Sequence, residues 1–382
     1  MTMRENVKRY ILECQDELKQ LIRDLCAIPA PSNREEQRAA FCKKWFEDNG
    51  VKDVLIDEAL NVICSHNVTS DNDLVVFAAH TDTVFPDLAP LPFAEKDGIM
   101  YCPGVTDDTA HLAVLMLCAR YIIRSAIPTR TGILFVANSG EEGLGNLKGI
   151  RAVVAQYGSR MKAFITLDDT RLTNIVTRAV GSHRYRITAT TDGGHSFRDF
   201  GNRNAIQVLA SLVDALYRIP VPKYGDSHTT YNVGTFTGGT SVNTIAQTAE
   251  MLYEYRSDNH QCLAEMKAAF ERAISQVYED GATLSVENIG QRPCAGDVDP
   301  VAWDALIHTV QTAIFRVTGQ EAVFTAGSTD CNIPLSIGVP SVCIGACVGG
   351  GCHTREEWLD TTSLVDGCSL FFEVFYTYCV NH

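Results

Sequence analysis

Short apolar runs that alternate with helical stretches are the feature that most constrains the fold of this chain. "DVLI", "LVVFAA", "GILFVAN" and "AFITL" have the length and composition of buried strands. Longer segments such as "HLAVLMLCARYIIRSAI" separate them and have helical character. This alternation predicts an α/β domain with a largely parallel sheet. After "IPAPS", Ser32 and Glu35 have the spacing of a capping box and predict the start of a helix.

Acids or a histidine follow three of the predicted strands. In an open α/β sheet, ligands bind beyond the carboxyl ends of the strands, so these side chains are expected to converge at one edge. They are His80 and Asp82 after "LVVFAA", Glu141 and Glu142 after "GILFVAN", and Asp168 and Asp169 after "AFITL".

The pattern changes between residues 180 and 290. There, strands with polar faces such as "HRYRITATT" occur with long helices but without strict alternation, which indicates a smaller α+β domain. The α/β pattern resumes afterwards. We therefore expect a domain of residues 1–179 and 291–382 with residues 180–290 inserted in it.

Composition excludes several kinds of partner. The net charge of −14 disfavours nucleic acid and anionic membranes, which require basic patches. No stretch is long and apolar enough for a membrane span, and the first residues lack the apolar core of a secretory signal, so a cytoplasmic location is expected. The segment "GEEGLGNLKG" lacks a phosphate-binding pattern after a strand, which disfavours a nucleotide-binding protein.

Gathered carboxylates raise one another's pKa unless cations intervene, so metal binding explains the pattern economically. Histidine and carboxylate ligands suit zinc, cobalt or manganese, and such sites commonly hold two ions bridged by a carboxylate. A thiolate site at Cys343, Cys347, Cys352 and His353 is the weaker alternative, because paired C-x-x-C spacing is missing.

In order and spacing, the motifs "AAHTDTV", "PGVTDDTAH", "NSGEEGLG", "ITLDDT" and "GGGCHTREEW" resemble those of the M20 family of metallopeptidases and deacylases. The resemblance extends over nearly the whole chain. It implies two divalent ions, with zinc expected first and cobalt or manganese as alternatives. The implied ligands are His80 and Asp168 for one ion, Glu142 and His353 for the other, and Asp107 as the bridge.

The resemblance also implies catalytic roles. Glu141 matches the general base, and Asp82 would hold the His80 imidazole in one tautomer. Two positions leave alternatives open. Asp168 is preferred over its neighbour Asp169 as the ligand, and His111, where many relatives have a different segment, is expected to cap or pack although it is a candidate spare ligand.

The inserted region resembles the family's lid and dimerisation domain, which implies a homodimer. His195 would stabilise an oxyanion, in its own subunit or in a partner, and Asn243 and Arg256 would contact the substrate. The expected activity is that of a di- or tripeptide aminopeptidase. An N-acyl-amino-acid deacylase is the near alternative, and a catalytically idle homologue that binds a ligand or metal is a third.

Overall fold

The computed structural model describes residues 3–277 and 281–380, which form two compact units. Unit 1 comprises Met1–Ala179 and Gly296–His382, and unit 2 comprises Val180–Ala295. The expected boundary at residue 290 falls inside a strand of unit 2 that runs to Arg292. Within the described residues, no helix is both long enough and apolar enough to cross a membrane.

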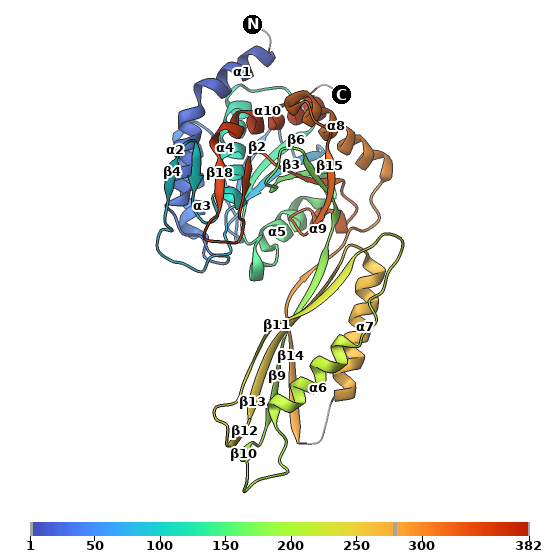
Figure 1. Ribbon diagram of the computed structural model, residues 1–382. Helices are drawn as coiled ribbons and strands as arrows, with labels where there is room; N and C mark the ends of the chain where they lie inside the picture. Colours follow the sequence, from blue (N-terminus) through green and yellow to red (C-terminus); the bar gives the residue numbers. More distant parts are fainter. Residues whose placement is uncertain (1–2, 278–280, 381–382) are drawn as a thin grey trace. The chain divides into compact units, whose positions relative to one another are not determined.

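Unit 1 is built on a mixed, mostly parallel sheet, as the sequence predicted, with helices on both faces (Figure 1). Its order is β1 (Leu55–Ile56), β2 (Val62–His66), β6 (Gly132–Asn138), β3 (Leu74–His80), β7 (Met161–Leu167), β16 (Ser341–Ile344), β8 (Asn174–Ala179) and β15 (Val323–Gly327). Strand β3 lies parallel to β6 and β7, and β7 lies parallel to β16. Because every residue of β3 and β6 is buried, these central strands read as continuous apolar runs in the sequence.

Each strand of the main sheet presents alternate side chains to opposite faces, and the helices of unit 1 cover both faces. On β3, Val75, Phe77 and Ala79 belong to the main core, which also includes side chains of α4 and α10. Helices α5 and α9 contact each other and are drawn below the sheet in Figure 1. The helices are α1 (Met3–Glu13), α2 (Gln15–Cys26), α3 (Glu36–Asp48), α4 (His111–Arg124), α5 (Lys148–Tyr157), α8 (Pro300–Thr318), α9 (Asn332–Ser336) and α10 (Leu364–Phe375).

A second, antiparallel sheet of unit 1 supports the loops that follow the main strands. Its order is β17 (Val348–Gly350), β18 (Trp358–Asp360), β5 (Ile99–Tyr101) and β4 (Ala94–Lys96). Strand β5 leads into the segment η1 (Val105–Ala110), in which Asp107 and Asp108 depart from helical dihedral angles. This sheet therefore holds both "PGVTDDTAH" and "GGGCHTREEW".

Unit 2 is an antiparallel sheet with two helices along it. The sheet order is β11 (Thr229–Gly238), β13 (Thr248–Ser257), β9 (Gly181–Thr191) and β14 (Ala282–Arg292), and a small pair joins β10 (Gly194–His195) to β12 (Thr244–Ile245). The helices α6 (Ala205–Tyr217) and α7 (His260–Val277) contact each other, and both contact β9 and β13. Their apolar side chains form a separate core with the sheet.

The predicted capping box at Ser32 is wrong. Helix α3 starts at Glu36, and its N-cap residue Glu35 makes no side-chain cap. Ser32 instead donates its hydroxyl to the carboxylate of Asp82, 2.7 Å away. Glu35 accepts from the main-chain N–H of Asn33 and pairs with Lys148. The spacing matches that of a capping box, but both side chains bond to groups outside the helix instead.

Gly367 of α10 provides a test of the packing in unit 1. A Cβ there would lie 1.6 Å from the main-chain oxygen of Ala346, so the helix and the loop after β16 would have to separate. Overpacking costs about 1–3 kcal/mol, which exceeds the roughly 1 kcal/mol of helix propensity that alanine gains. We expect Gly367→Ala to lower the unfolding midpoint in thermal and urea melts.

The matched control is Asp366→Ala on the exposed side of the same helix. It should change stability by no more than about 0.5 kcal/mol. A glycine variant as stable as this control would contradict the close approach of α10 to Ala346.

Candidate metal centre

The loops after β3, β6 and β7 bring acids and histidines together at one edge of the main sheet. Among the described residues, three groups have potential ligand atoms that lie within 4.8 Å of one another. The groups are His80, Asp107 and Asp168; Asp107, Glu142 and His353; and His80, Glu141 and Glu142. Asp107 belongs to the first and second groups, each of which contains one histidine and one further acid.

The carboxylate of Asp107 faces two histidines at once. Its Oδ1 lies 3.1 Å from Nε2 of His80, and its Oδ2 lies 3.1 Å from Nε2 of His353. Nε2 of His353 is also 3.1 Å from Oε1 of Glu142, and Nε2 of His80 is 4.0 Å from Oδ1 of Asp168. Two ligands about 2.1 Å from one tetrahedral ion lie about 3.4 Å apart, so these spacings fit two cations that share Asp107.

Without a cation, the side chains beside Asp107 hold their protons more firmly than usual, whereas hydrogen bonds from His353 and His80 outweigh burial and lower the pKa of Asp107 itself. Burial and the neighbouring Asp107 raise the pKa of Asp168 well above its usual range. Burial, opposed by the hydrogen bond from His353, raises the pKa of Glu142 to about 7. Hydrogen bonds to Asp107 and Glu142 raise the pKa of His353 to about 10. The donor set of imidazoles and carboxylates therefore fits divalent ions, which would displace these protons.

His80 shows the same competition between burial and charge. Burial favours its neutral form, but the carboxylates of Asp108, Asp107 and Asp82 outweigh it and raise the imidazole pKa well above its usual range. Its Nδ1 lies 3.1 Å from the main-chain oxygen and 3.4 Å from Oδ1 of Asp82. When Nδ1 carries the proton and donates it to Asp82, Nε2 presents its lone pair on the side of Asp107.

Asp82 also holds the loop after β6. Its Oδ1 accepts from the main-chain N–H of Glu141 at 2.9 Å, and its Oδ2 accepts from that of Glu142 at 3.0 Å. The sequence suggested only its contact with the imidazole. The structure adds that this fully buried carboxylate links the histidine loop to the Glu141–Glu142 loop.

Glu357 was missed in the sequence, although it lies in the quoted motif "GGGCHTREEW". It is fully buried, and its carboxylate accepts from the main-chain N–H groups of Gly104, Thr106 and Asp107 at 2.7–2.9 Å. Burial raises its pKa to about 7 despite these bonds. The sequence shows two adjacent acids, Glu356 and Glu357, but it does not show which of them points inward.

His111 and Asp169 have partners of their own. Nδ1 of His111 lies 2.8 Å from the main-chain oxygen of Thr106, and its Nε2 lies 2.9 Å from that of Asp169. This agrees with a packing role and not with a spare ligand. The Asp169 carboxylate accepts from Asn174 and from the N–H of Arg171, so Asp168 and not Asp169 faces His80.

The cysteines near the cluster do not join it. The thiol of Cys343 donates to the main-chain oxygen of Asp168, and that of Cys347 lies beside His111. Among the residues that the structure describes, no cysteine belongs to a group of potential metal ligands. The thiolate alternative has no support here.

The three residues that the resemblance assigned to the lid lie in unit 2. His195 and Asn243 are close together, because the N–H of Ser196 donates to the main-chain oxygen of Asn243, and His195 pairs with Thr244. Arg256 lies near the other end of β13, where it pairs with Glu254. Arg256 lies eight positions after Thr248 along β13, or roughly 26 Å away. Unit 2 therefore brings His195 and Asn243 together but not Arg256.

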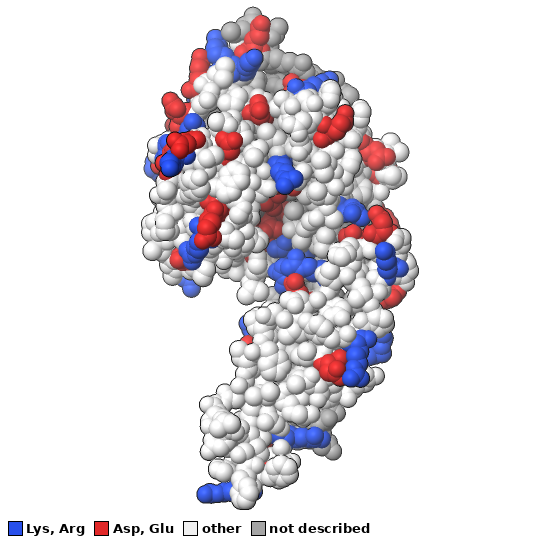
Figure 2. All heavy atoms as spheres, viewed as in Figure 1, with Lys and Arg blue, Asp and Glu red and all other residues white. Residues whose placement is uncertain are grey.

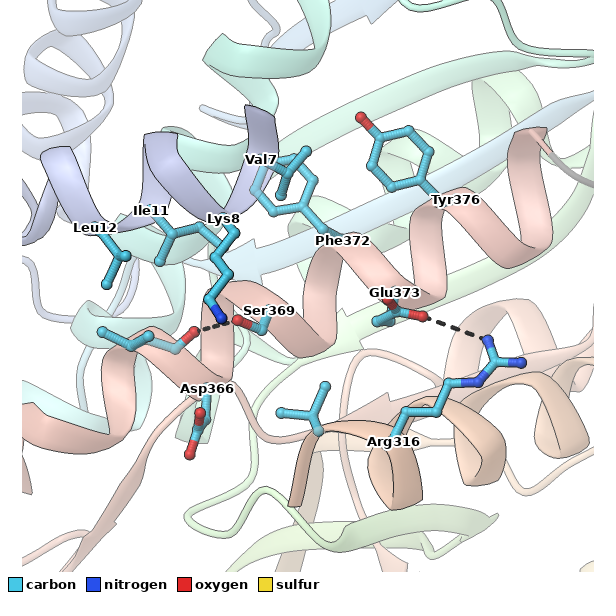
Figure 3. Close-up of a pocket in the computed structure, with 12 residues that line it drawn as sticks. Val7, Lys8, Ile11, Leu12, Arg316, Asp366, Ser369, Phe372, Glu373 and Tyr376 are labelled. Atoms are coloured by element: carbon cyan, nitrogen blue, oxygen red, sulfur yellow. Dashed lines mark hydrogen bonds and ion pairs between the residues drawn. The ribbon is translucent and has the colours of Figure 1, made fainter. Parts of the chain in front are cut away.

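Two cavities of unit 1 differ in their surroundings. One of about 390 Å³ adjoins the cluster and is lined by Asp107 and Asp168. Acidic atoms are visible at the bottom of a hollow in this unit in Figure 2. The other, of about 420 Å³, lies among α1, α8 and α10, where Arg316 pairs with Glu373 (Figure 3). It contains none of the predicted site residues.

A model of peptidase family M20/M25/M40 matches residues 76–377. The chain belongs to this family. The predicted resemblance is thereby confirmed, and the protein is a metal-dependent hydrolase.

Relatives and solved structures extend the comparison over nearly the whole chain. The protein YqjE of Bacillus subtilis is 27% identical over 90% of this chain and 93% of its own length. A succinyl-diaminopimelate desuccinylase of Corynebacterium glutamicum is 23% identical over 91% and 92% of the two chains.

Two solved structures share the fold. A tripeptidase from Staphylococcus aureus has a TM-score of 0.74 at 24% identity and covers 94% of this chain and 97% of its own. The YXEP protein of Bacillus subtilis, described as a dinuclear metal binding peptidase, has a TM-score of 0.63 at 18% identity, with the same coverage.

Glu357 provides a test of how Asp107 is held. A glutamine there keeps the size but replaces one acceptor oxygen with a donor that opposes main-chain N–H groups. We expect Glu357→Gln to weaken metal binding about 10- to 100-fold, as measured by competition with a chelator.

Glu356→Gln is the matched control, because Glu356 is the exposed neighbour. It should bind metal as the unmodified protein does. Equal affinity in both variants would show that the Asp107 segment does not depend on the buried carboxylate.

Proposed function

We propose that the protein hydrolyses the amide bond of small peptides with two bound divalent ions, most simply as a di- or tripeptide aminopeptidase. The observation that carries the proposal is the Asp107 carboxylate, with each oxygen 3.1 Å from a different histidine. His80 and Asp168 would hold one ion, Glu142 and His353 the other, and Asp107 both. Zinc is the first choice, and cobalt or manganese would fit the same donors.

When bound, the ions would polarise the scissile carbonyl and make water a stronger nucleophile. Glu141 is buried beside Glu142, and its carboxylate lies in one of the three potential ligand groups. It would remove a proton from the attacking water and deliver it to the departing amine. Asp82 fixes the main-chain position of Glu141 through the N–H bond and orients His80.

The lid residues would act on the substrate from unit 2. His195 is exposed, and its Nδ1 accepts from the N–H of Phe197, which leaves Nε2 to donate to an oxyanion. Asn243 and Arg256 would contact the substrate carboxylate or oxyanion. The roughly 26 Å of β13 between the level of His195 and Arg256 exceeds the length of a dipeptide. If both residues contact one substrate, two copies of the chain would have to contribute, and a homodimer is therefore part of the proposal.

A deacylase that acts on N-acyl amino acids is the second candidate. The observation in its favour is the succinyl-diaminopimelate desuccinylase relative, which is 23% identical over most of both chains. The same ligands and base would serve either reaction, and the pocket around the leaving group would decide between them.

The net charge of −14 supports a small-molecule substrate over nucleic acid or membrane, and a cytoplasmic location remains part of the proposal.

Hydrolysis of a panel of di- and tripeptides and N-acyl amino acids tests the function. The protein is stripped of metal and then reloaded with zinc, cobalt or manganese. We expect turnover only with metal, and we expect Glu141→Gln to lower kcat about 10²- to 10⁴-fold while it still binds metal at the same stoichiometry.

Glu142→Gln is the comparison variant, because it should lose metal as well as activity. Metal binding without turnover on any substrate would favour the idle homologue. Full activity in Glu141→Gln would exclude Glu141 as the base. Preference for N-acyl amino acids over peptides would select the deacylase.

A further inference from the structure

Arg171 lines the cavity that adjoins the metal centre, on the side of Asp168. This cavity of about 390 Å³ is also lined by Asp107, Asp168 and Asn174. Arg171 is exposed, and within residues 3–277 and 281–380 its guanidinium has no hydrogen bond or ion pair. A guanidinium that none of the described residues hydrogen-bonds or ion-pairs therefore borders the space into which a substrate on the candidate metal centre would extend.

Other arginines near the centre are engaged. Arg355, two residues after His353, pairs with Asp87 at 2.7 Å and lies over the ring of Phe85. Arg38 is buried and donates to main-chain oxygens, including that of Thr81. Both guanidinium groups hold loops together and are not free for a ligand.

The acid nearest to Arg171 in sequence, Asp169, attracts its charge but forms no hydrogen bond or ion pair with its guanidinium. The Asp169 carboxylate accepts from Nδ2 of Asn174 at 3.0 Å and from the main-chain N–H of Arg171, also at 3.0 Å. These neutral donors satisfy the carboxylate within its own loop. Among residues 3–277 and 281–380, the donors of the Arg171 guanidinium are thus open to a ligand carboxylate.

The main chain that carries Arg171 is fixed on several sides. The N–H of Asp168 donates to the oxygen of Ile344, and the N–H of Gly349 donates to the oxygen of Thr170. Gly345 packs so closely that a Cβ there would lie 2.3 Å from the main-chain oxygen of Arg171. A fixed main chain with a free planar cation is suited to recognition of a carboxylate, because only the side chain has to be ordered.

We propose that Arg171 is a specificity-determining residue that binds a carboxylate of the substrate, so that the preferred substrates are acidic amides. This rests on the proposed hydrolysis and deepens it. The carboxylate would come from an acidic side chain or a dicarboxylic acyl group, or from the C-terminus of the peptide. A bidentate pair with guanidinium would hold that end of the substrate while the amide lies at the metal centre.

The test compares kcat/KM for matched acid and amide substrates with the metal-loaded protein. Glu-Leu is paired with Gln-Leu, Leu-Glu with Leu-Gln, N-succinyl-leucine with N-succinamoyl-leucine, and Leu-Leu with Leu-Leu amide. In the unmodified protein, at least one pair should favour the acid by about tenfold or more. The pair that responds identifies the source of the carboxylate.

Arg171→Gln should lower that ratio at least about tenfold, Arg171→Glu should reverse it, and Arg171→Lys should restore part of it. Arg124→Ala removes an exposed guanidinium from α4 and should leave the ratio unchanged. Ratios that are the same in all Arg171 variants and in the unmodified protein would overturn the proposal.

A binding measurement separates this inference from the proposed function. Titration calorimetry with glutarate and succinate compares the metal-loaded protein with Arg171→Gln and Arg124→Ala. Weaker binding in Arg171→Gln alone supports carboxylate recognition even if no substrate is hydrolysed. Equal binding in all three proteins overturns it, whatever the activity.

Discussion

Mutual repulsion among carboxylates at one edge of the main sheet is the constraint on which unit 1 depends. Asp82 and Glu142 are buried there and Asp107 and Asp168 are half-buried, and their charges cost free energy unless donors or cations offset them. Main-chain N–H groups and imidazoles provide part of this compensation. Divalent ions would offset the repulsion that these groups leave. The same side chains therefore bear on the stability of the fold and form the candidate metal centre.

Two acids behind the candidate ligands, Asp82 and Glu357, fix the positions of the loops that carry them. Asp82 links the loops after β3 and β6, and Glu357 binds three N–H groups around Asp107. Neither acid lies in a group of candidate ligands that shares Asp107. Carboxylates that accept from the main chain set where a loop passes, and so they determine the distances between side chains that the loop carries.

Sequence reasoning was most successful where periodicity and order suffice. The strands β3, β6 and β7 and the acids after them were predicted from apolar runs and the residues that follow them, because parallel strands deliver their carboxyl ends to one edge. The inward position of Glu357 and the bond from Ser32 to Asp82 were not predictable in this way. Both depend on contacts between segments 50 or more residues apart, which no local pattern records. No local pattern distinguishes Arg171 from other loop residues, because its fixed main chain depends on contacts with distant segments.

The bond from Ser32 to Asp82 also determines where the chain can be cut. The family match begins at residue 76, yet the hydroxyl that contacts Asp82 and the main-chain oxygen of Glu142 lies more than forty residues earlier. Helices α2 and α3, which flank it in sequence, contribute apolar side chains to the main core. A fragment trimmed to the segment that the family model matches would therefore lack part of its hydrophobic interior and one donor to Asp82, the acid that joins the loops after β3 and β6. In this protein the unit of folding is therefore longer than the segment that the family model matches.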